Sequence, residues 1–260
     1  MGNIPLQSGI VYGPVNSRRL GKSLGLNILP DSYKFCTFDC VYCQYGWTHV
    51  HSLDAGEKAG ELPSPGEIDL ALTRAMEELV GKKTRVDYIT FSGNGESTLH
   101  PKFPEAVEIA RHLRDRYVPE AKLAILSNSS TANRKDVRKA LGRLDVRIMK
   151  LDAGSAEIIR KLNRPSEGIE FEAIVEGLKT LKSVTIQSLF VDGQFGNSGQ
   201  REVEKWLAAL EEIAPIEVQI YTLDRAPASD KVIAIDRKRL EAIAKKAQER
   251  GFKVTPYWRE

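Results

Sequence analysis

Short apolar runs alternate with longer amphipathic segments along most of this chain. The short runs mix β-branched with other apolar residues, which is typical of strands buried on both faces. They cover residues 24–29, 86–91, 122–126, 147–151, 184–191, 217–223 and 252–256. The amphipathic segments predict helices at residues 67–80, 104–116, 134–141, 171–181, 202–213 and 237–249. This alternation predicts parallel strands joined by right-handed crossovers.

The number of strand–helix units sets the expected fold. About six units and a trailing strand are fewer than the eight units of a closed TIM barrel, so we predict an α/β fold with a partial (β/α)6 TIM-type barrel. We expect a single domain over residues 1–260, with an N-terminal extension at 1–22, the core barrel at 23–225 and a C-terminal helix and strand at 226–260. Ligands of such folds bind beyond the carboxyl ends of the strands, so the loops there should converge on one rim.

Composition and charge exclude several classes of protein. The chain carries 38 basic and 35 acidic side chains, and its net charge of +3 is too balanced to indicate nucleic-acid binding by itself. No apolar stretch approaches the roughly 20 residues of a membrane span. The N-terminal sequence lacks the charged and apolar regions of a signal peptide. We therefore expect a cytoplasmic monomer without membrane contact.

All three cysteines of the chain lie within residues 36–43. An odd and tightly clustered set does not suit a disulfide framework. Separated by three and then two residues, Cys36, Cys40 and Cys43 can hold three corners of an iron–sulfur cube and leave the fourth iron open. A structural zinc site, with His49 or His51 as the fourth ligand, is the alternative.

The cysteine loop resembles that of the radical SAM superfamily. It follows the first predicted strand, and an aromatic residue, Tyr42, stands directly before the last cysteine. The segment from Ser92 to Glu96, after the second predicted strand, is similar to the glycine-rich, glutamate-containing motif of that family. Glycine permits close backbone approach, and a carboxylate can accept hydrogen bonds from an ammonium group. Taken alone, the segment also suits a strand-to-helix turn.

The resemblance implies a radical SAM enzyme with one 4Fe–4S cluster on the three cysteines. In that family an electron, supplied by a donor such as flavodoxin or ferredoxin, cleaves S-adenosylmethionine to methionine and a 5′-deoxyadenosyl radical, which abstracts hydrogen from a substrate. The positions implied for cofactor binding are Tyr42, Gly93, Asn94, Gly95, Glu96, Ser127, Asn128, Lys150, Asp152 and Gln187. The resemblance does not identify the catalytic residue, and the candidates are Lys150, His100 and Tyr221.

Three segments resemble the branch of the superfamily that contains the tRNA wyosine-base synthase. They are residues 12–25, 95–101 and 150–153. That synthase holds a second cluster on additional cysteines, and this chain has no cysteine outside the main loop. The resemblance therefore implies hydrogen abstraction from a substrate such as a tRNA base or nucleotide, with one cluster. The alternatives are an activase that makes a glycyl radical in a protein partner, and a zinc-stabilised, non-catalytic binding module.

Two further features bear on the substrate. Arg18, Arg19 and Lys22 form a small basic cluster before the first predicted strand. This cluster is either a solvated face or a contact for a phosphate-bearing substrate such as RNA. The glycine-rich segment 192–199 is expected to cover the barrel mouth and shield the reaction from water.

Overall fold

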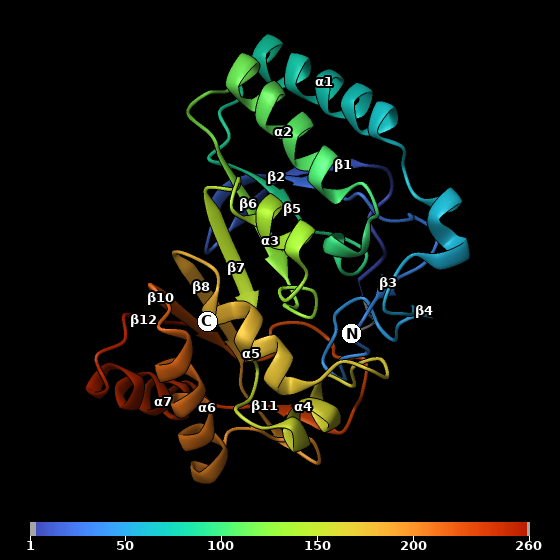
Figure 1. Ribbon diagram of the computed structural model, residues 1–260. Helices are drawn as coiled ribbons and strands as arrows, with labels where there is room; N and C mark the ends of the chain where they lie inside the picture. Colours follow the sequence, from blue (N-terminus) through green and yellow to red (C-terminus); the bar gives the residue numbers. More distant parts are fainter. Residues whose placement is uncertain (1–3, 259–260) are drawn as a thin grey trace.

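A curved, mostly parallel sheet forms the centre of the computed structural model, which describes residues 4–258 (Figure 1). Its strands are β1 (Val11–Ser17), β2 (Gly21–Leu26), β5 (Tyr88–Phe91), β6 (Lys122–Ser127), β7 (Val146–Lys150), β8 (Val184–Leu189), β10 (Glu217–Tyr221) and β12 (Val254–Tyr257). They lie in the order β1–β2–β5–β6–β7–β8–β10–β12. Strand β1 is antiparallel to β2, and every other neighbouring pair is parallel. The predicted α/β fold is confirmed.

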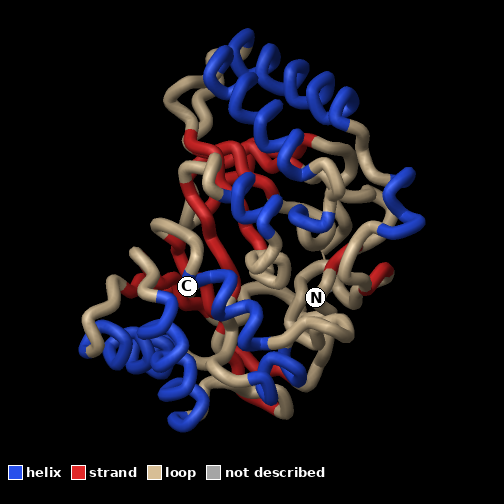
Figure 2. Tube along the Cα trace, in the orientation of Figure 1, coloured by secondary structure: helices blue, strands red, loops and turns tan. Residues whose placement is uncertain are grey.

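Helices lie along the outside of the sheet (Figure 2). They are α1 (Pro65–Gly81), α2 (Phe103–Tyr117), α3 (Lys135–Leu141), α4 (Ala156–Leu162), α5 (Phe171–Lys179), α6 (Gln200–Ile213) and α7 (Arg237–Glu249). The short elements are β3 (Phe35–Cys36), β4 (Val50–His51), β9 (Val191–Gly193), β11 (Val232–Ala234) and the 3-10 helices η1 (Gly56–Glu61) and η2 (Ser97–Leu99). Among residues 4–258, no helix is long and apolar enough to span a bilayer.

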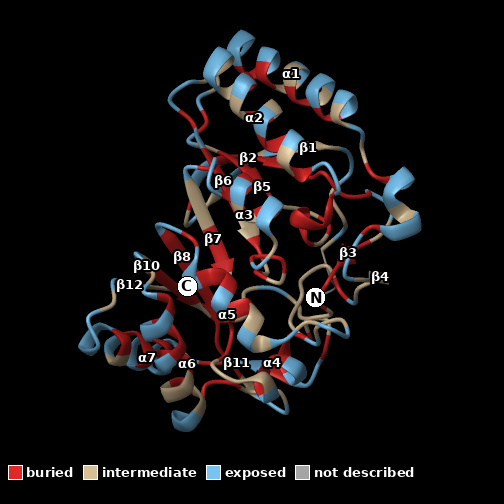
Figure 3. Ribbon diagram, viewed as in Figure 1, coloured by how far each residue is buried: buried red, intermediate tan, exposed pale blue. Residues whose placement is uncertain are grey.

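The core lies between the sheet and the helices (Figure 3). Edge-to-face aromatic pairs contact helices at two places: Phe91, on β5, with Phe103, whose ring centroids are 5.6 Å apart, and Phe190, between β8 and β9, with Trp206, at 5.0 Å. Such pairs add to the free energy gained from burying their area. The alternation of apolar strands and amphipathic helices therefore builds one large core cluster, and two smaller clusters are separate from it.

Each predicted strand and helix has a counterpart in the structure, but several short elements, strand β1 and helix α4 were not predicted. Strand β1 comes from the segment expected as an N-terminal extension, and it carries a register irregularity between Tyr12 and Val15. Helix α4 has seven residues, which is too short for a clear helical period. The predicted run 184–191 also divides into β8 and β9.

Helix α6 packs directly on the loop that follows β7. A Cβ atom on Gly154 would lie 2.1 Å from the carbonyl carbon of Lys205 and 2.2 Å from the backbone nitrogen of Trp206. Trp206 is fully buried, and its indole N–H donates to the Ser188 hydroxyl at 2.9 Å. Close backbone contact therefore fixes the loop after β7, which also carries Asp152.

We expect Gly154→Ala to lower the free energy of unfolding by about 1–3 kcal/mol, because the added methyl group must displace helix backbone. Gly81→Ala is the matched control, since its Cβ would meet no atom within 4 Å and Gly81 is the last residue of α1. The control should be neutral or slightly stabilising, because alanine favours a helix over glycine by up to about 1 kcal/mol. Urea unfolding of both variants measures the difference, and equal effects would contradict this account of the α6 contact.

Candidate functional site

A cavity of about 470 Å³ lies at the carboxyl ends of the parallel strands. All three cysteines line it, together with residues from the loops after several strands. Of the other predicted site residues, those that line the cavity are Tyr42, Gly93, Gly95, Glu96, Ser127, Asn128, Lys150, Gln187 and Tyr221. The strand-end loops therefore converge on one rim, as the parallel topology predicts.

Other predicted residues lie off the cavity wall. The buried Asn94 side chain donates to two backbone carbonyls, at 2.9 and 2.8 Å. His100 pairs through Nε2 with a backbone carbonyl at 2.9 Å, and burial lowers its pKa. Asp152 is buried and lies beneath the wall. Residues 192–199, expected to cover the mouth, do not line the cavity either, and the buried Asn197 amide donates to the carbonyl of Asp152 at 2.5 Å.

Backbone hydrogen bonds fix the cysteine loop on two sides. At its start, Phe35 exchanges two hydrogen bonds with the loop after β5, at 2.9 and 3.0 Å. A Cβ on Gly95 would lie 1.7 Å from the Phe35 carbonyl oxygen, so this approach requires glycine. Farther along, the Val41 N–H donates to the carbonyl of Leu162, the last residue of α4, at 3.0 Å. The glycine-rich segment therefore seats the cysteine loop as well as lining the cavity.

Nitrogen donors face the sulfur atoms of this loop. The Phe38 N–H and the Asn128 side-chain amide each lie 3.4 Å from Cys36 Sγ. The Asn163 side-chain amide lies 3.5 Å from Cys40 Sγ. Hydrogen bonds to the sulfurs are among the contacts by which proteins tune iron–sulfur clusters. Three thiols on one cavity, with N–H groups directed at them, fit a cluster held by three protein ligands.

Lys34 places a positive charge beside these sulfurs, and its role was not predicted. Its side chain is 2% exposed, and its ammonium donates to the Gly46 carbonyl at 2.9 Å and to the Cys43 sulfur. Burial lowers the pKa of Lys34, but the sulfur of Cys43 and those of the other two cysteines raise it above its ordinary value. The lysine is therefore a cation whose charge faces the cysteine loop.

The two histidines considered as a fourth zinc ligand each contact backbone atoms. Among residues 4–258, no three His, Cys, Asp or Glu side chains, the three cysteines included, lie close enough to hold one metal ion together. His49 Nδ1 accepts from the Lys34 N–H at 3.3 Å, and His51 Nε2 pairs with the Thr37 carbonyl at 3.0 Å. Both histidines are therefore engaged by the backbone of the loop that carries the cysteines.

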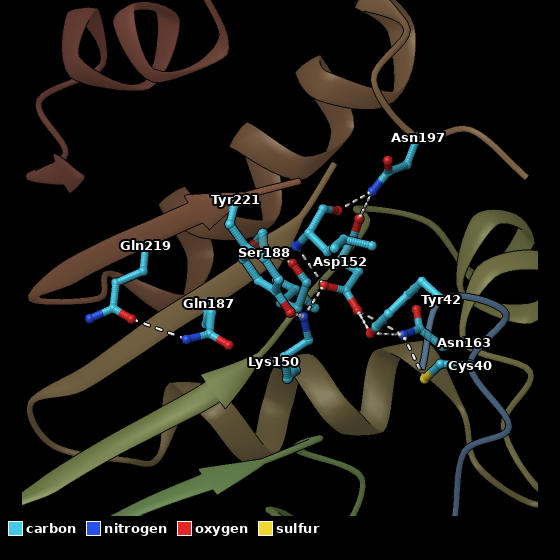
Figure 4. Close-up of polar contacts among 12 residues, drawn as sticks. Cys40, Tyr42, Lys150, Asp152, Asn163, Gln187, Ser188, Asn197, Gln219 and Tyr221 are labelled. Carbon is cyan, nitrogen blue, oxygen red and sulfur yellow. Dashed lines mark hydrogen bonds and ion pairs between the residues drawn. The ribbon is translucent and has the colours of Figure 1, made fainter. Parts of the chain in front are cut away.

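Asp152 is the centre of a buried polar network (Figure 4). Its carboxylate forms an ion pair with Lys150 at 2.8 Å and accepts hydrogen bonds from the Asn163 amide, at 2.7 Å, and the Tyr42 hydroxyl. Lys150 also donates to the Tyr221 hydroxyl at 2.7 Å. Burial lowers the pKa of Lys150, but Asp152 and Tyr221 raise it above its ordinary value, so Lys150 is a cation. Through Asn163, the network connects the cavity wall to the cysteine loop.

Glu96 joins the loops after β5 and β6. Its carboxylate accepts hydrogen bonds from the Thr98 N–H and hydroxyl, at 3.1 and 2.7 Å, the Ser127 hydroxyl, at 3.0 Å, and the Asn128 N–H, at 2.6 Å. Burial raises the pKa of Glu96, while these hydrogen bonds lower it. The carboxylate therefore fixes the cavity wall, and its contact with a cofactor stays a prediction.

The turn between β1 and β2 forms another part of the wall. Its residues 15–19 line the cavity, and Arg18 donates to the Trp258 carbonyl at 2.5 Å and pairs with Asp224. Lys22 belongs to the same basic cluster in sequence but does not line the cavity. The sequence predicted a basic cluster here, and the long-range contacts of Arg18 show how the turn is placed at the cavity.

In the metal-free protein, we expect Cys36 and Cys40 to react slowly with iodoacetamide near pH 8, because only the thiolate is nucleophilic. Burial raises the pKa of Cys36 to about 12 and that of Cys40 to about 11. Their rates should rise about tenfold per pH unit up to about pH 10, whereas an ordinary thiol levels off above its pKa of about 8.5. Lys34→Met should slow both further, because Lys34 lowers both pKa values.

Peptide mass spectrometry after timed alkylation measures the rate at each cysteine. A plateau near pH 9 at Cys36 and Cys40 would show that burial has not raised their pKa. Lys82→Met serves as the control, because Lys82 is exposed and pairs with Glu78 at the surface.

Comparisons with known proteins agree with this geometry. The family model described as the radical SAM superfamily matches residues 32–207. A UPF0026 protein of Methanocaldococcus jannaschii is 35% identical over 230 residues, which cover 86% of this chain and 66% of that protein. The chain therefore spans slightly less than two thirds of the length of that relative.

Solved structures share the fold. A radical SAM methyltransferase from Sphaerobacter thermophilus has a TM-score of 0.67 and 14% identity, and the match covers 91% of this chain and 66% of that chain. The structure of TYW1 with a lysine–pyruvate adduct bound has a TM-score of 0.60 and 14% identity. The match covers 87% of this chain and 73% of that chain. The family match spans more than half of the 260 residues and coincides with the cysteine loop and the cavity. The chain therefore belongs to the radical SAM superfamily, a family whose cofactors are S-adenosylmethionine and an iron–sulfur cluster.

Proposed function

We propose that this enzyme uses a single 4Fe–4S cluster, held by Cys36, Cys40 and Cys43, to cleave S-adenosylmethionine reductively. The observation that carries the proposal is that all three cysteines line one cavity with the strand-end loops. No further cysteine is present in the chain, so a second thiolate-bound cluster has no ligands. When bound, the cluster and S-adenosylmethionine supply a 5′-deoxyadenosyl radical that abstracts hydrogen from the substrate.

The residues of the chain position and shield this chemistry. Asn128, Asn163 and Lys34 direct N–H groups at the sulfurs. The cationic Lys150 suits a carboxylate or hydroxyl group of the cofactor. We assign cofactor contact to it together with Tyr42, Gly93, Gly95, Ser127, Asn128 and Gln187, which also line the cavity. Asp152, Asn94 and Glu96 then act mainly by holding this wall in place.

The substrate we propose is a tRNA base or another nucleotide. The segments that resemble the wyosine-base synthase branch support it, and so does the basic turn of Arg18 and Arg19 at the cavity. The likeness to TYW1 supports the shared barrel only. An activase that makes a glycyl radical in a protein partner is the second candidate, because activases of similar length in the radical SAM superfamily also use a single cluster. We also propose a cytoplasmic monomer, a single domain over residues 1–260, and flavodoxin or ferredoxin as the electron donor.

Anaerobically purified protein should be brown, contain about four iron and four sulfide per chain, as a cubane cluster requires, and release 5′-deoxyadenosine once reduced. We expect Cys40→Ala to abolish cleavage, because two cysteines cannot hold the cluster. His51→Ala is the control, since its ring pairs with the Thr37 carbonyl, and it should keep iron and cleavage. Iron and sulfide assays with chromatography of the nucleoside measure both. Stoichiometric zinc and no cleavage after reconstitution would show the zinc module instead.

The substrate class can be tested by following deuterium. The reduced enzyme is offered either total RNA or total protein from cells grown in deuterated medium, and 5′-deoxyadenosine is analysed by mass spectrometry. Deuterium should enter 5′-deoxyadenosine from the RNA fraction, and Cys40→Ala should show no transfer. Transfer from the protein fraction alone would favour the activase.

A further inference from the structure

Arg19 occupies an unusual place at the cavity. It lies in the turn between β1 and β2, where the Ser17 hydroxyl accepts hydrogen bonds from the N–H groups of Arg19 and Leu20, at 3.3 and 3.2 Å. The neighbouring Arg18 fastens this turn to the far edge of the sheet through Asp224 and the Trp258 carbonyl. The backbone that carries Arg19 is therefore held from both sides.

Two tyrosine rings hold the Arg19 guanidinium. Its Cζ atom lies 4.4 Å from the ring centroid of Tyr221 and 5.1 Å from that of Tyr257. These rings extend from the ends of β10 and β12, which are neighbours in the sheet. Stacking on aromatic faces fixes the plane of a guanidinium while leaving its N–H donors unused.

The donors of Arg19 have no acceptor. Within residues 4–258, its side chain makes no hydrogen bond or ion pair, and its Nε atom is buried without a partner. A buried, unpaired donor lowers stability, and more so when it is charged. Such a cost is ordinarily offset by a partner that binds there.

The other cations at the cavity are already engaged. Lys34 faces the cysteine sulfurs, Lys150 pairs with Asp152, Arg18 pairs with Asp224, and Arg225 donates to the Gln44 amide oxygen at 3.2 Å. Arg19 therefore differs from them in that no group of the described chain accepts a hydrogen bond from its side chain.

We propose that Arg19 binds an oxyanion of the substrate, a phosphate or a carboxylate, at the end of the cavity formed by the β1–β2 turn. A planar guanidinium matches two oxygens of either group with two parallel hydrogen bonds. This subsite rests on the proposed function, because it assigns the substrate class of the same cavity. The subsite also gives Tyr221 two roles, since its ring stacks on Arg19 and its hydroxyl accepts a hydrogen bond from Lys150.

The subsite can be tested without knowing the substrate. Protein labelled with ¹⁵N and purified anaerobically is titrated with inorganic phosphate or with acetate, and the Nε–H signals of its arginines are followed by NMR. The Arg19 signal is identified by its loss in Arg19→Gln. Sodium chloride keeps the ionic strength constant, because a general salt effect acts on every exposed charge.

We expect a saturable shift of the Arg19 signal with at least one of the two anions. Saturation at a lower concentration of phosphate assigns a phosphate-bearing substrate, and the reverse assigns a carboxylate. Arg225→Gln is the matched control, since it removes a cavity arginine that lacks the tyrosine stacking, and it should leave the Arg19 response unchanged. No saturable shift with either anion, or a shift that chloride alone reproduces, would overturn the proposal. The titration does not require cleavage of S-adenosylmethionine, so its failure is distinct from failure of the proposed function.

Discussion

The site depends on one backbone contact, between the Phe35 carbonyl and the α-carbon of Gly95. Any side chain at position 95 would begin 1.7 Å from that oxygen, and the backbone there has a φ of +143°, which only glycine adopts readily. Without this contact the start of the cysteine loop would move away from the end of β5. The first sulfur, on Cys36, would move with it. Gly95, in the loop after β5, thus determines the position of Cys36, in the loop after β2.

Buried charges then determine the electrostatics of the cavity. Lys34, Lys150, Asp152 and Glu96 are all largely buried, and each has polar partners. Burying an ion costs several kcal/mol, and pairing in a low-dielectric interior offsets that cost only when the geometry is good. Apolar residues of similar volume could pack here more cheaply. The gain from the charged groups is a set of fixed cations and hydrogen-bond donors beside the thiols, which need not reorganise when charge changes nearby.

Much of the fold could be predicted from the sequence, because buried parallel strands require short apolar runs and their crossover helices require one apolar face. The cysteine spacing likewise predicted a metal-binding loop, which a single local segment encodes. Other features depend on tertiary contacts. A lysine is ordinarily exposed, so only the packing around Lys34 reveals its role. Asn163 follows a helix of seven residues, and nothing local indicates that its amide reaches Cys40.

Predicted and actual roles also differed where neighbouring residues point in opposite directions. Asn94 stands between Gly93 and Gly95, which line the cavity, yet its own side chain points away and holds the N-terminal segment. His100 follows the same loop, and its Nε2 pairs with a backbone carbonyl. An irregular loop therefore presents only some residues of a continuous sequence motif to the cavity.

Closure of the barrel separates cofactor binding from substrate selection. The edge strands β1 and β12 are not paired with each other, so the sheet leaves a gap that some other segment must fill. The β1–β2 turn fills it, through contacts between Arg18 and Trp258 that join residues 240 positions apart. The cysteine loop and the turn thus belong to different segments of the chain, and the turn can change without disturbing the metal ligands. Under the proposed function, the cysteine loop sets the reaction type, and the charge carried by the turn selects the substrates that approach it.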